Sequence, residues 1–304
     1  MKVFLTGAAG FVGAATLRAL LADGHEVAAP VRPASAAPRL VPFEGRYRRL
    51  DIDLRNGDAV AAAVADFRPE CVMHLAWWGV ANNARFERRQ IAENLDAACA
   101  LVEASGAAGA SSFIGIGSQG EYGRIEPMRE DALPEPTTLY GASKLAALFL
   151  TRQLAAQAGM RHAWGRIFST YGPGDNEGWL IPSLINTMLA GQRPQVTLGT
   201  QYWDWLYIED VARAIVAMAI TPAAQGVFNI GSGQPVNVRS VIETVRDLAA
   251  PGMELVFGEI PFRPDQVMHM KADITRLTAA TGWRPSVPMD EGLSRTVASM
   301  RAST

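Results

Sequence analysis

The first half of the chain alternates short apolar runs with longer helical patterns, and this alternation constrains the fold more than any other feature. The apolar runs have the length of buried strands, and they lie at Val3–Thr6, Glu26–Val31, Tyr47–Leu50, Cys71–Ala76, Phe113–Gly117 and His162–Phe168. Helices are predicted between them at Phe11–Asp23, Asp58–Asp66, Arg85–Ala108 and Leu139–Ala158. Strands that alternate with helices form βαβ units. The pattern therefore predicts an α/β fold with a doubly wound parallel sheet.

The second half is more irregular and predicts a smaller cap. Turn-forming clusters such as Gly172-Pro-Gly-Asp and Pro261-Phe-Arg-Pro separate its helical stretches. Those helices are predicted near Leu180–Ala190, Val211–Thr221, Val238–Ala250 and Met289–Arg301. We expect residues 1–170 to form the sheet domain, with roughly 204–230 returning to it. Residues 171–304 are expected to form mainly the cap, with the two parts interleaved.

Composition argues against several classes of protein. A chain of 304 residues can bury a sizeable core, and its net charge of −2 offers no basic field for nucleic acid or anionic lipid. No apolar stretch reaches the about 18 residues of a membrane span. The N-terminus lacks the layout of a signal peptide, and Cys71 and Cys99 lie in apolar stretches typical of buried thiols. The four histidines show no metal-ligand spacing. We therefore expect a cytoplasmic protein without a metal, nucleic acid or membrane as partner.

A glycine-rich turn follows the first predicted strand. Gly7, Gly10 and Gly13 lie in Thr6-Gly-Ala-Ala-Gly-Phe-Val-Gly, where the first helix opens. Glycines permit a tight turn and a close approach of the backbone to a pyrophosphate, and the helix N-terminus adds free N–H groups. The placement predicts a dinucleotide site in a Rossmann-type sheet, although the spacing is G-x-x-G-x-x-G rather than G-x-G-x-x-G. The alternative is a tight turn that binds nothing.

The end of the second predicted strand favours NADP slightly over NAD. An acidic residue there would bind the ribose 2′-hydroxyl, whereas an arginine would accept a 2′-phosphate. The strand ends Ala29-Pro-Val-Arg, with Arg32 and no carboxylate. If Arg32 is only a surface charge, the choice between NADP and NAD stays open.

Tyr140 and Lys144 are the strongest indication of chemistry. They lie four residues apart at the start of a predicted helix, so their side chains share one helical face. The chain has only three lysines, so a chance pair at this spacing is improbable. A cation within a few ångströms lowers the pKa of a phenol and favours its ionised form. The pair is therefore predicted to act as an acid/base unit.

Further motifs follow in order along the chain. They are Asp53-Leu, His74-Leu-Ala-Trp, Asn94-Leu, Ser118-Gln-Gly-Glu-Tyr-Gly, Tyr140-Gly-Ala-Ser-Lys, Arg166-Ile-Phe-Ser-Thr-Tyr-Gly-Pro-Gly, Asp204-Trp-Leu-Tyr-Ile-Glu-Asp-Val-Ala, Phe228-Asn-Ile-Gly-Ser-Gly and Gly282-Trp-Arg-Pro. Together with the glycine turn, this series resembles extended short-chain dehydrogenases/reductases of the NAD-dependent epimerase/dehydratase family, which modify nucleotide sugars. The resemblance runs nearly from end to end.

The resemblance implies roles for individual positions. Ser118, Tyr140 and Lys144 match the family's catalytic trio, in which the phenol exchanges the substrate's hydroxyl proton while hydride moves. The implied cofactor-binding residues are Gly7, Ala9, Gly10, Phe11, Val12, Gly13, Arg32, Asp53, Leu54, Leu75, Ala76, Asn94, Tyr140, Lys144 and Phe168. The implied substrate-binding residues are Trp78, Ser118, Gln119, Ser169, Trp179, Trp203 and Arg263. As structural alternatives, Asp53 could cap the next helix and Asn94 could be a surface residue within a helix.

The segment after Ser118 narrows the reaction. In the family's 4,6-dehydratases, an Asp-Glu pair at this point transfers protons, whereas this chain has Gln119 and Gly120. Two redox activities are left. The favoured one is reduction of a nucleoside-diphosphate 4-keto-6-deoxyhexose by NAD(P)H, because the second strand lacks its acid. The alternative is a 4-epimerase with retained NAD, and a dehydratase or a non-catalytic NADP-sensing protein is less favoured.

Two substitutions in the substrate region depart from the family pattern. Trp203 stands where an arginine commonly pairs with a nucleotide phosphate, and Ser169 replaces a common asparagine. Arg263 still matches a later phosphate-binding arginine. Trp78 and Trp179 could stack on sugar or base faces, although single tryptophans more often anchor a core. The resemblance also implies a homodimer, built from the helix before the fifth strand and the helix of Tyr140.

Overall fold

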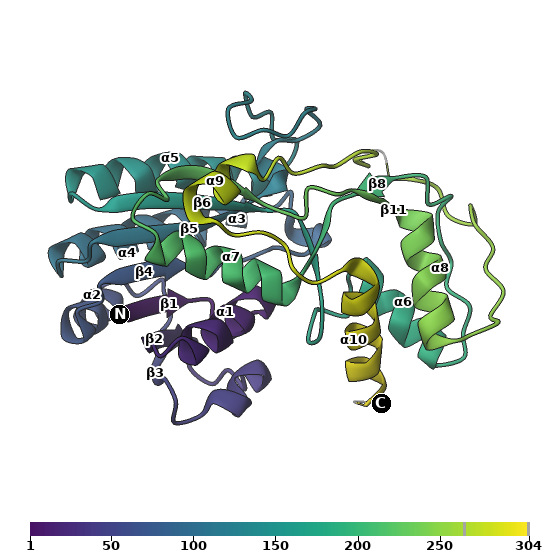
Figure 1. Cartoon of the computed structure of the whole chain (residues 1–304). Helices are drawn as coiled ribbons and strands as arrows, with labels where there is room; N and C mark the ends of the chain where they lie inside the picture. Colours follow the sequence, from purple (N-terminus) through teal and green to yellow (C-terminus); the bar gives the residue numbers. More distant parts are fainter. Residues whose placement is uncertain (264–265, 303–304) are drawn as a thin grey trace.

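A computed structural model describes residues 1–263 and 266–302. In these residues, seven strands form one parallel sheet with the order β10-β6-β5-β4-β1-β2-β3 (Figure 1). The strands are β1 (Lys2–Thr6), β2 (Glu26–Val31), β3 (Arg48–Asp51), β4 (Cys71–His74), β5 (Ser112–Ser118), β6 (Arg161–Ile167) and β10 (Gly226–Ile230). The strand order reverses between β1 and β4, where doubly wound sheets bind their ligands. The predicted Rossmann-type parallel sheet is confirmed.

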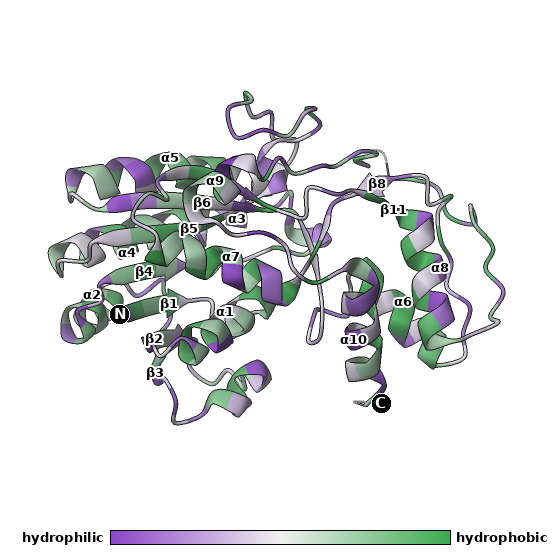
Figure 2. Ribbon diagram, in the orientation of Figure 1, coloured by the Kyte–Doolittle hydropathy of each residue, from purple (hydrophilic) through white to green (hydrophobic). Residues whose placement is uncertain are grey.

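Helices cover both faces of this sheet, which explains why its strands are apolar throughout. In β1, Val3 and Leu5 pack on the face covered by α1 (Phe11–Ala22) and α7 (Ile208–Ile220). Phe4 packs on the opposite face, which α2 (Gly57–Phe67), α4 (Leu95–Ala107) and α5 (Leu139–Gln157) cover. Because successive side chains of a strand point to opposite faces, both sets must be apolar. Figure 2 accordingly shows the ribbon of β1 and β4 mostly in the hydrophobic colour.

The C-terminal half contributes to the sheet and also forms a separate group of helices. The helices α6 (Leu180–Leu189), α8 (Val238–Ala249) and α10 (Met289–Arg301) pack together at the right of Figure 1. Two short strand pairs, β7 (Ser169–Tyr171) with β9 (Trp205–Tyr207) and β8 (Tyr202–Trp203) with β11 (Val236–Asn237), connect this group to the sheet. The helix α9 (Thr275–Thr281) packs on β10 and α7. The boundary expected near residue 170 stays a prediction.

Two buried carboxylates, Asp204 and Asp210, hold segments of the sheet and of the C-terminal helices together. Asp204 accepts hydrogen bonds from the backbone N–H groups of Ser232, Gly233 and Ala272 at 2.6–2.9 Å. Asp210, in the first turn of α7, accepts bonds from the backbone N–H groups of Ser286 and Val287 just before α10. Buried carboxylates are tolerated when several donors satisfy them. The motif around Asp204 to Asp210 therefore contains residues that hold distant segments together.

The single helix predicted over Arg85–Ala108 is wrong. The structure has a 3-10 turn η2 (Asn82–Ala84), a short helix α3 (Arg89–Ala92) and a separate α4 that begins at Leu95. Asn94 causes the break, because its side-chain amide donates to the carbonyls of Trp78 and Gln90 and its Oδ1 accepts from the N–H of Trp78 at 2.7 Å. A short amide side chain that bonds nearby backbone competes with a continuous helix. Asn94 is thus buried rather than on the surface.

Candidate active site

One cavity of about 1170 Å³ opens at the carboxyl ends of β1, β4 and β5. Its lining includes every residue that the sequence proposes for the site. On the side of the glycine turn and β2 these are Gly7, Ala9, Gly10, Phe11, Val12, Gly13, Arg32, Asp53, Leu54, Leu75, Ala76, Asn94 and Phe168. On the side of α5 and the C-terminal half they are Trp78, Ser118, Gln119, Tyr140, Lys144, Ser169, Trp179, Trp203 and Arg263. Segments far apart in the sequence therefore meet at one site, and the role of each residue is a proposal.

The glycine turn has the shape that a pyrophosphate requires. Gly7 has φ +76°, and a Cβ on it would lie 2.6 Å from the backbone nitrogen of Ala76. A Cβ on Gly13 would overlap the carbonyl oxygen of Gly7. Gly10 is the N-cap of α1, and among the described residues no side chain caps this helix. The first N–H groups of α1 are left for an anion, so these residues fit a dinucleotide.

The cavity wall beyond the glycine turn carries Asp53 and Arg32. The carboxylate of Asp53 accepts three hydrogen bonds from Arg55, which lower its pKa to about 2. Asn56, not Asp53, caps α2 by accepting a bond from Ala59 N–H at 3.1 Å. Asp53 therefore does not have the capping role considered for it, and its carboxylate stays ionised beside the cavity.

Tyr140 is held at the start of α5. Thr138 caps this helix by accepting a bond from the N–H of Gly141 at 3.1 Å, and Tyr140 N–H donates to the carbonyl of Arg85 at 2.9 Å. The ring is 6% exposed and stands edge-on to Trp77, with 6.4 Å between the ring centres. The hydroxyl of Ser118 lies close enough to affect the ionisation of Tyr140, and it also accepts from Gly120 N–H at 3.1 Å. The predicted phenol and serine hydroxyl are thus neighbours.

The pKa of Tyr140 is raised, and burial of the phenol is the largest cause. A hydrogen bond with Ser118 and the charge of Arg85 oppose this rise, whereas the charge of Glu121 adds to it. The sequence led us to expect Lys144 as the cation acting on the phenol. Lys144 instead donates to the carbonyl of Ile116 at 2.6 Å and lies 3.8 Å from the ring centre of Trp77. Burial lowers the pKa of Lys144 to about 7, and Glu121 opposes this.

Glu121 supports the site from outside the cavity. It is fully buried, and its carboxylate accepts from the N–H of Ser118, the indole of Trp164 and the guanidinium of Arg166 at 2.7–3.0 Å. It closes a capping box around the 3-10 turn η3 (Gln119–Glu121). Its hydrogen bonds hold the protein framework, and its charge also raises the pKa of Tyr140. The two residues that line the cavity after Ser118 are therefore Gln119 and Gly120, neither of which titrates.

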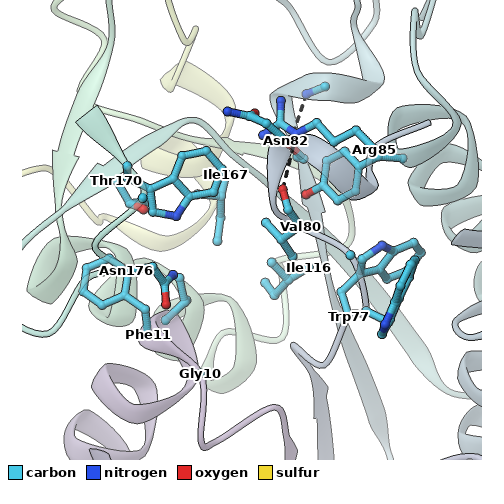
Figure 3. Close-up of a pocket in the computed structure, with 18 of the residues that line it drawn as sticks. Gly10, Phe11, Trp77, Val80, Asn82, Arg85, Ile116, Ile167, Thr170 and Asn176 are labelled. Atoms are coloured by element: carbon cyan, nitrogen blue, oxygen red, sulfur yellow. Dashed lines mark hydrogen bonds between the residues drawn. The ribbon is translucent and has the colours of Figure 1, made fainter. Parts of the chain in front are cut away.

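Several lining residues were not singled out from the sequence. Arg85 was hidden in the wrongly predicted helix, and it lies at the opposite end of the cavity from Gly10 and Phe11 (Figure 3). Arg39, in the 3-10 segment η1 (Pro38–Phe43), donates to the carbonyl of Gly174 at 2.8 Å and thus joins two loops across the cavity. Asp175 lies in the same loop, and burial raises its pKa to about 7. No local pattern marks these residues, because their contacts span long stretches of chain.

The C-terminal side of the cavity is aromatic and polar. The indole of Trp203 donates to the carbonyl of Val267 at 2.8 Å, and its ring centre lies 5.7 Å from that of Trp205. Among the described residues, the buried Oε1 of Gln201 and Nε1 of Trp205 have no hydrogen-bond partner. Buried polar atoms without a protein partner are satisfied by water or a ligand. Both residues line the cavity, as does Arg263.

A doubly wound parallel sheet with a glycine turn and a Ser-Tyr-Lys trio on one cavity defines an extended short-chain dehydrogenase/reductase. Residues 3–231 match the model of the NAD dependent epimerase/dehydratase family, and the chain belongs to that family. It is 30% identical to the GDP-6-deoxy-D-mannose reductase of Pseudomonas aeruginosa, with 96% of this chain and 94% of the relative covered.

Solved structures agree with this assignment. The UDP-glucose 4-epimerase of Thermotoga maritima with UDP-glucose is 26% identical, has a TM-score of 0.90, and is matched over 100% of this chain and 99% of its own. The UDP-glucose 4-epimerase of Thermus thermophilus in complex with NAD is 26% identical, has a TM-score of 0.88, and is matched over 100% of both chains. The chain is therefore an enzyme of an NAD-dependent family that modifies nucleotide sugars. In residues 1–263 and 266–302, none of the helices has the length and apolar character needed to cross a membrane.

Proposed function

We propose that the enzyme reduces the C4 ketone of a nucleoside-diphosphate 4-keto-6-deoxyhexose and uses NAD(P)H as a cosubstrate. The observation that carries the proposal is the buried phenol of Tyr140 beside Ser118, with the non-titrating Gln119 and Gly120 next in the cavity wall. Elimination of water would require an acid/base pair at these two positions. The likeness to the Pseudomonas aeruginosa reductase supports the same choice.

The environment of Tyr140 suits reduction. A bound nicotinamide supplies the hydride, and Tyr140 donates its hydroxyl proton to the C4 oxygen as the ketone becomes an alcohol. Because burial raises the pKa of Tyr140, the phenol holds its proton at neutral pH until it is needed. The Ser118 hydroxyl orients the substrate oxygen. Lys144, whose ammonium is held by the carbonyl of Ile116, is assigned to the nicotinamide ribose.

The rest of the substrate would lie toward the C-terminal side of the cavity. There we assign Arg263 to the diphosphate, and Gln119 and Ser169 to the sugar. Trp78, Trp179 and Trp203 would provide faces on which sugar or base can stack. Asp53 and Leu54 would contact the adenine of the cofactor at the other end. A cytoplasmic location stays a prediction.

The second candidate is a 4-epimerase with retained NAD, which the likeness to two UDP-glucose 4-epimerases favours. The two activities separate when purified enzyme is incubated with a panel of 4-keto and 4-hydroxy nucleotide sugars. A reductase consumes added NADPH or NADH in stoichiometric amounts with a 4-keto substrate. An epimerase interconverts two 4-hydroxy sugars without net change in the cofactor. Interconversion of 4-hydroxy sugars without any consumption of added NADPH or NADH would exclude the reductase activity.

We expect Arg32→Ala to lower the preference for NADPH over NADH, measured as the ratio of kcat/KM values, by about tenfold. A charge-assisted hydrogen bond contributes about 1.5–3 kcal/mol, and 1.4 kcal/mol is tenfold. Arg32 is the better candidate for the 2′-phosphate because Arg39 is already bonded to Gly174 and to Asn176 Oδ1. Arg46→Ala, an exposed arginine in the same region, is the matched control. An unchanged ratio in Arg32→Ala would contradict the preference for NADP.

We also propose a homodimer through α4 and α5. The outer face of α5 carries an apolar stripe that includes Leu139, Phe149 and Leu150, which are 37–46% exposed. Phe149→Glu should convert a dimer into a 32.7 kDa monomer in light scattering after size exclusion, because a buried unpaired carboxylate opposes association. Leu133→Glu changes an exposed leucine outside α5 and should leave the mass unchanged. A wild-type monomer would refute the dimer.

A further inference from the structure

The guanidinium of Arg85 lies between two aromatic rings of the cavity. Its Cζ is 5.4 Å from the ring centre of Tyr140 and 5.7 Å from that of Trp179. Its Nε donates to the carbonyl of Val80 at 3.3 Å, as the dashed line in Figure 3 shows. The carbonyl of Arg85 also accepts from the N–H of Tyr140 at 2.9 Å. The side chain and the backbone of one residue therefore both contact the proton donor.

Few charged groups of the described residues act on Tyr140. Arg85 faces it from the segment between β4 and α3, and Glu121 faces it from η3. Lys144 follows one turn later on α5, but its ammonium is held on the carbonyl of Ile116 and over Trp77. The neutral neighbours are Ser118 and the edge of Trp77. Among the described residues, the charge of Arg85 lowers the pKa of this phenol and the charge of the buried Glu121 raises it.

We propose that Arg85 is a positioning residue for the reaction, whose cation over the ring of Tyr140 stabilises the ionised phenol. The inference deepens the proposed function, in which Tyr140 gives up its proton during reduction. As the proton leaves, the ring becomes negative and its attraction to the guanidinium grows. The contact with Trp179 holds the guanidinium in place from the loop before α6. The residue therefore acts on the developing charge more than on the neutral phenol.

Removal of the Arg85 charge should shift the pKa of Tyr140 in one direction, upward. A cation within about 4–6 Å lowers the pKa of an acid by about one unit or more. Arg85→Gln should therefore raise the pKa of Tyr140 by about one unit, so the phenol keeps its proton to higher pH. Arg85→Lys keeps the charge without the planar group and should raise it less.

The test is a spectroscopic titration of the whole protein that needs no substrate. The tyrosinate absorbance of wild type minus that of Tyr140→Phe reports Tyr140 alone. The same difference is taken between Arg85→Gln and the Arg85→Gln/Tyr140→Phe double variant. We expect the midpoint in the arginine variant to move upward and Arg88→Gln, an exposed neighbour, to leave it in place. An unchanged midpoint in Arg85→Gln, or an equal shift in Arg88→Gln, overturns the inference.

Kinetics with an accepted 4-keto substrate give an independent check. The rate of reduction falls at high pH as Tyr140 ionises. The falling, high-pH limb of the profile of kcat/KM against pH should therefore move to higher pH in Arg85→Gln. A purely structural role for Arg85 would raise KM at every pH without moving the limb, and that result also overturns the inference. If the proposed substrates fail altogether, the titration still decides the role of Arg85. The two failures are therefore distinguishable.

Discussion

Tyr140→Phe should lower the turnover of an accepted nucleotide sugar by at least about 100-fold, which is the usual scale for removal of a general acid. The change deletes the hydroxyl that we propose as the proton donor to the C4 oxygen, and it keeps the ring. The ring's packing against Trp77 and its place under Arg85 should therefore survive. The affinity for NADPH should stay close to that of wild type, because most of the residues assigned to the cofactor line the cavity on the side of the glycine turn and β2. Single-turnover reduction and cofactor titration measure the two quantities.

The control for Tyr140→Phe is Tyr47→Phe, which removes the hydroxyl of a tyrosine outside the cavity lining. This variant should turn over its substrate at the wild-type rate. Near-wild-type turnover by Tyr140→Phe with a true substrate would show that another group delivers the proton. A loss of cofactor binding equal to the loss of turnover would show that the phenol is needed for structure rather than for proton transfer.

Glu121→Gln should lower the free energy of unfolding by about 3–5 kcal/mol, because it leaves a buried cation without its partner. Glu121 and Arg166 are joined at 2.7 Å, and their side chains are 0% and 3% exposed. Glutamine fills nearly the same volume, and its Oε1 can still accept from Ser118 N–H and Trp164 Nε1, so the loss is confined to the contact with Arg166. Urea denaturation followed by tryptophan fluorescence and by circular dichroism measures it.

Two comparisons make that result specific. The Glu121→Gln/Arg166→Met double variant should regain much of the stability, since no unpaired charge is left in the core. Asp131→Asn breaks an exposed ion pair with Arg129 and should cost less than about 1 kcal/mol. If the double variant is as unstable as Glu121→Gln, the unpaired guanidinium is not the source of the loss.

The sheet was predictable from the sequence because its strands are local and apolar on both faces. Val3, Phe4 and Leu5 show this, since each face of β1 meets a layer of helices. The strand β10 was expected only as a segment that returns to the sheet. The helix over Arg85–Ala108 failed because helical periodicity does not reveal the three bonds of the Asn94 amide to the backbone of Trp78 and Gln90.

The site was predictable as far as its residues belong to local motifs. The residues of the glycine turn, Tyr140 and Lys144, which the sequence singled out by local motifs, all line one cavity. The contacts that affect the ionisation and position of these residues were not predictable. The Arg85 guanidinium reaches Tyr140 across 55 residues of chain, and Arg39 reaches Gly174 across 135 residues. Such pairs depend on how the loops meet above the sheet, and a single sequence carries no local sign of them.

The most direct test of the proposed reaction follows the hydride itself. NADPH that carries deuterium at both hydrogen positions of C4 of the nicotinamide is supplied with a nucleoside-diphosphate 4-keto-6-deoxyhexose, and the product is examined by mass spectrometry and NMR. We expect one deuterium per product sugar, located at C4, and equimolar oxidised cofactor. A reduced product without deuterium at C4, or conversion of the sugar without oxidation of the cofactor, would contradict the proposed reduction.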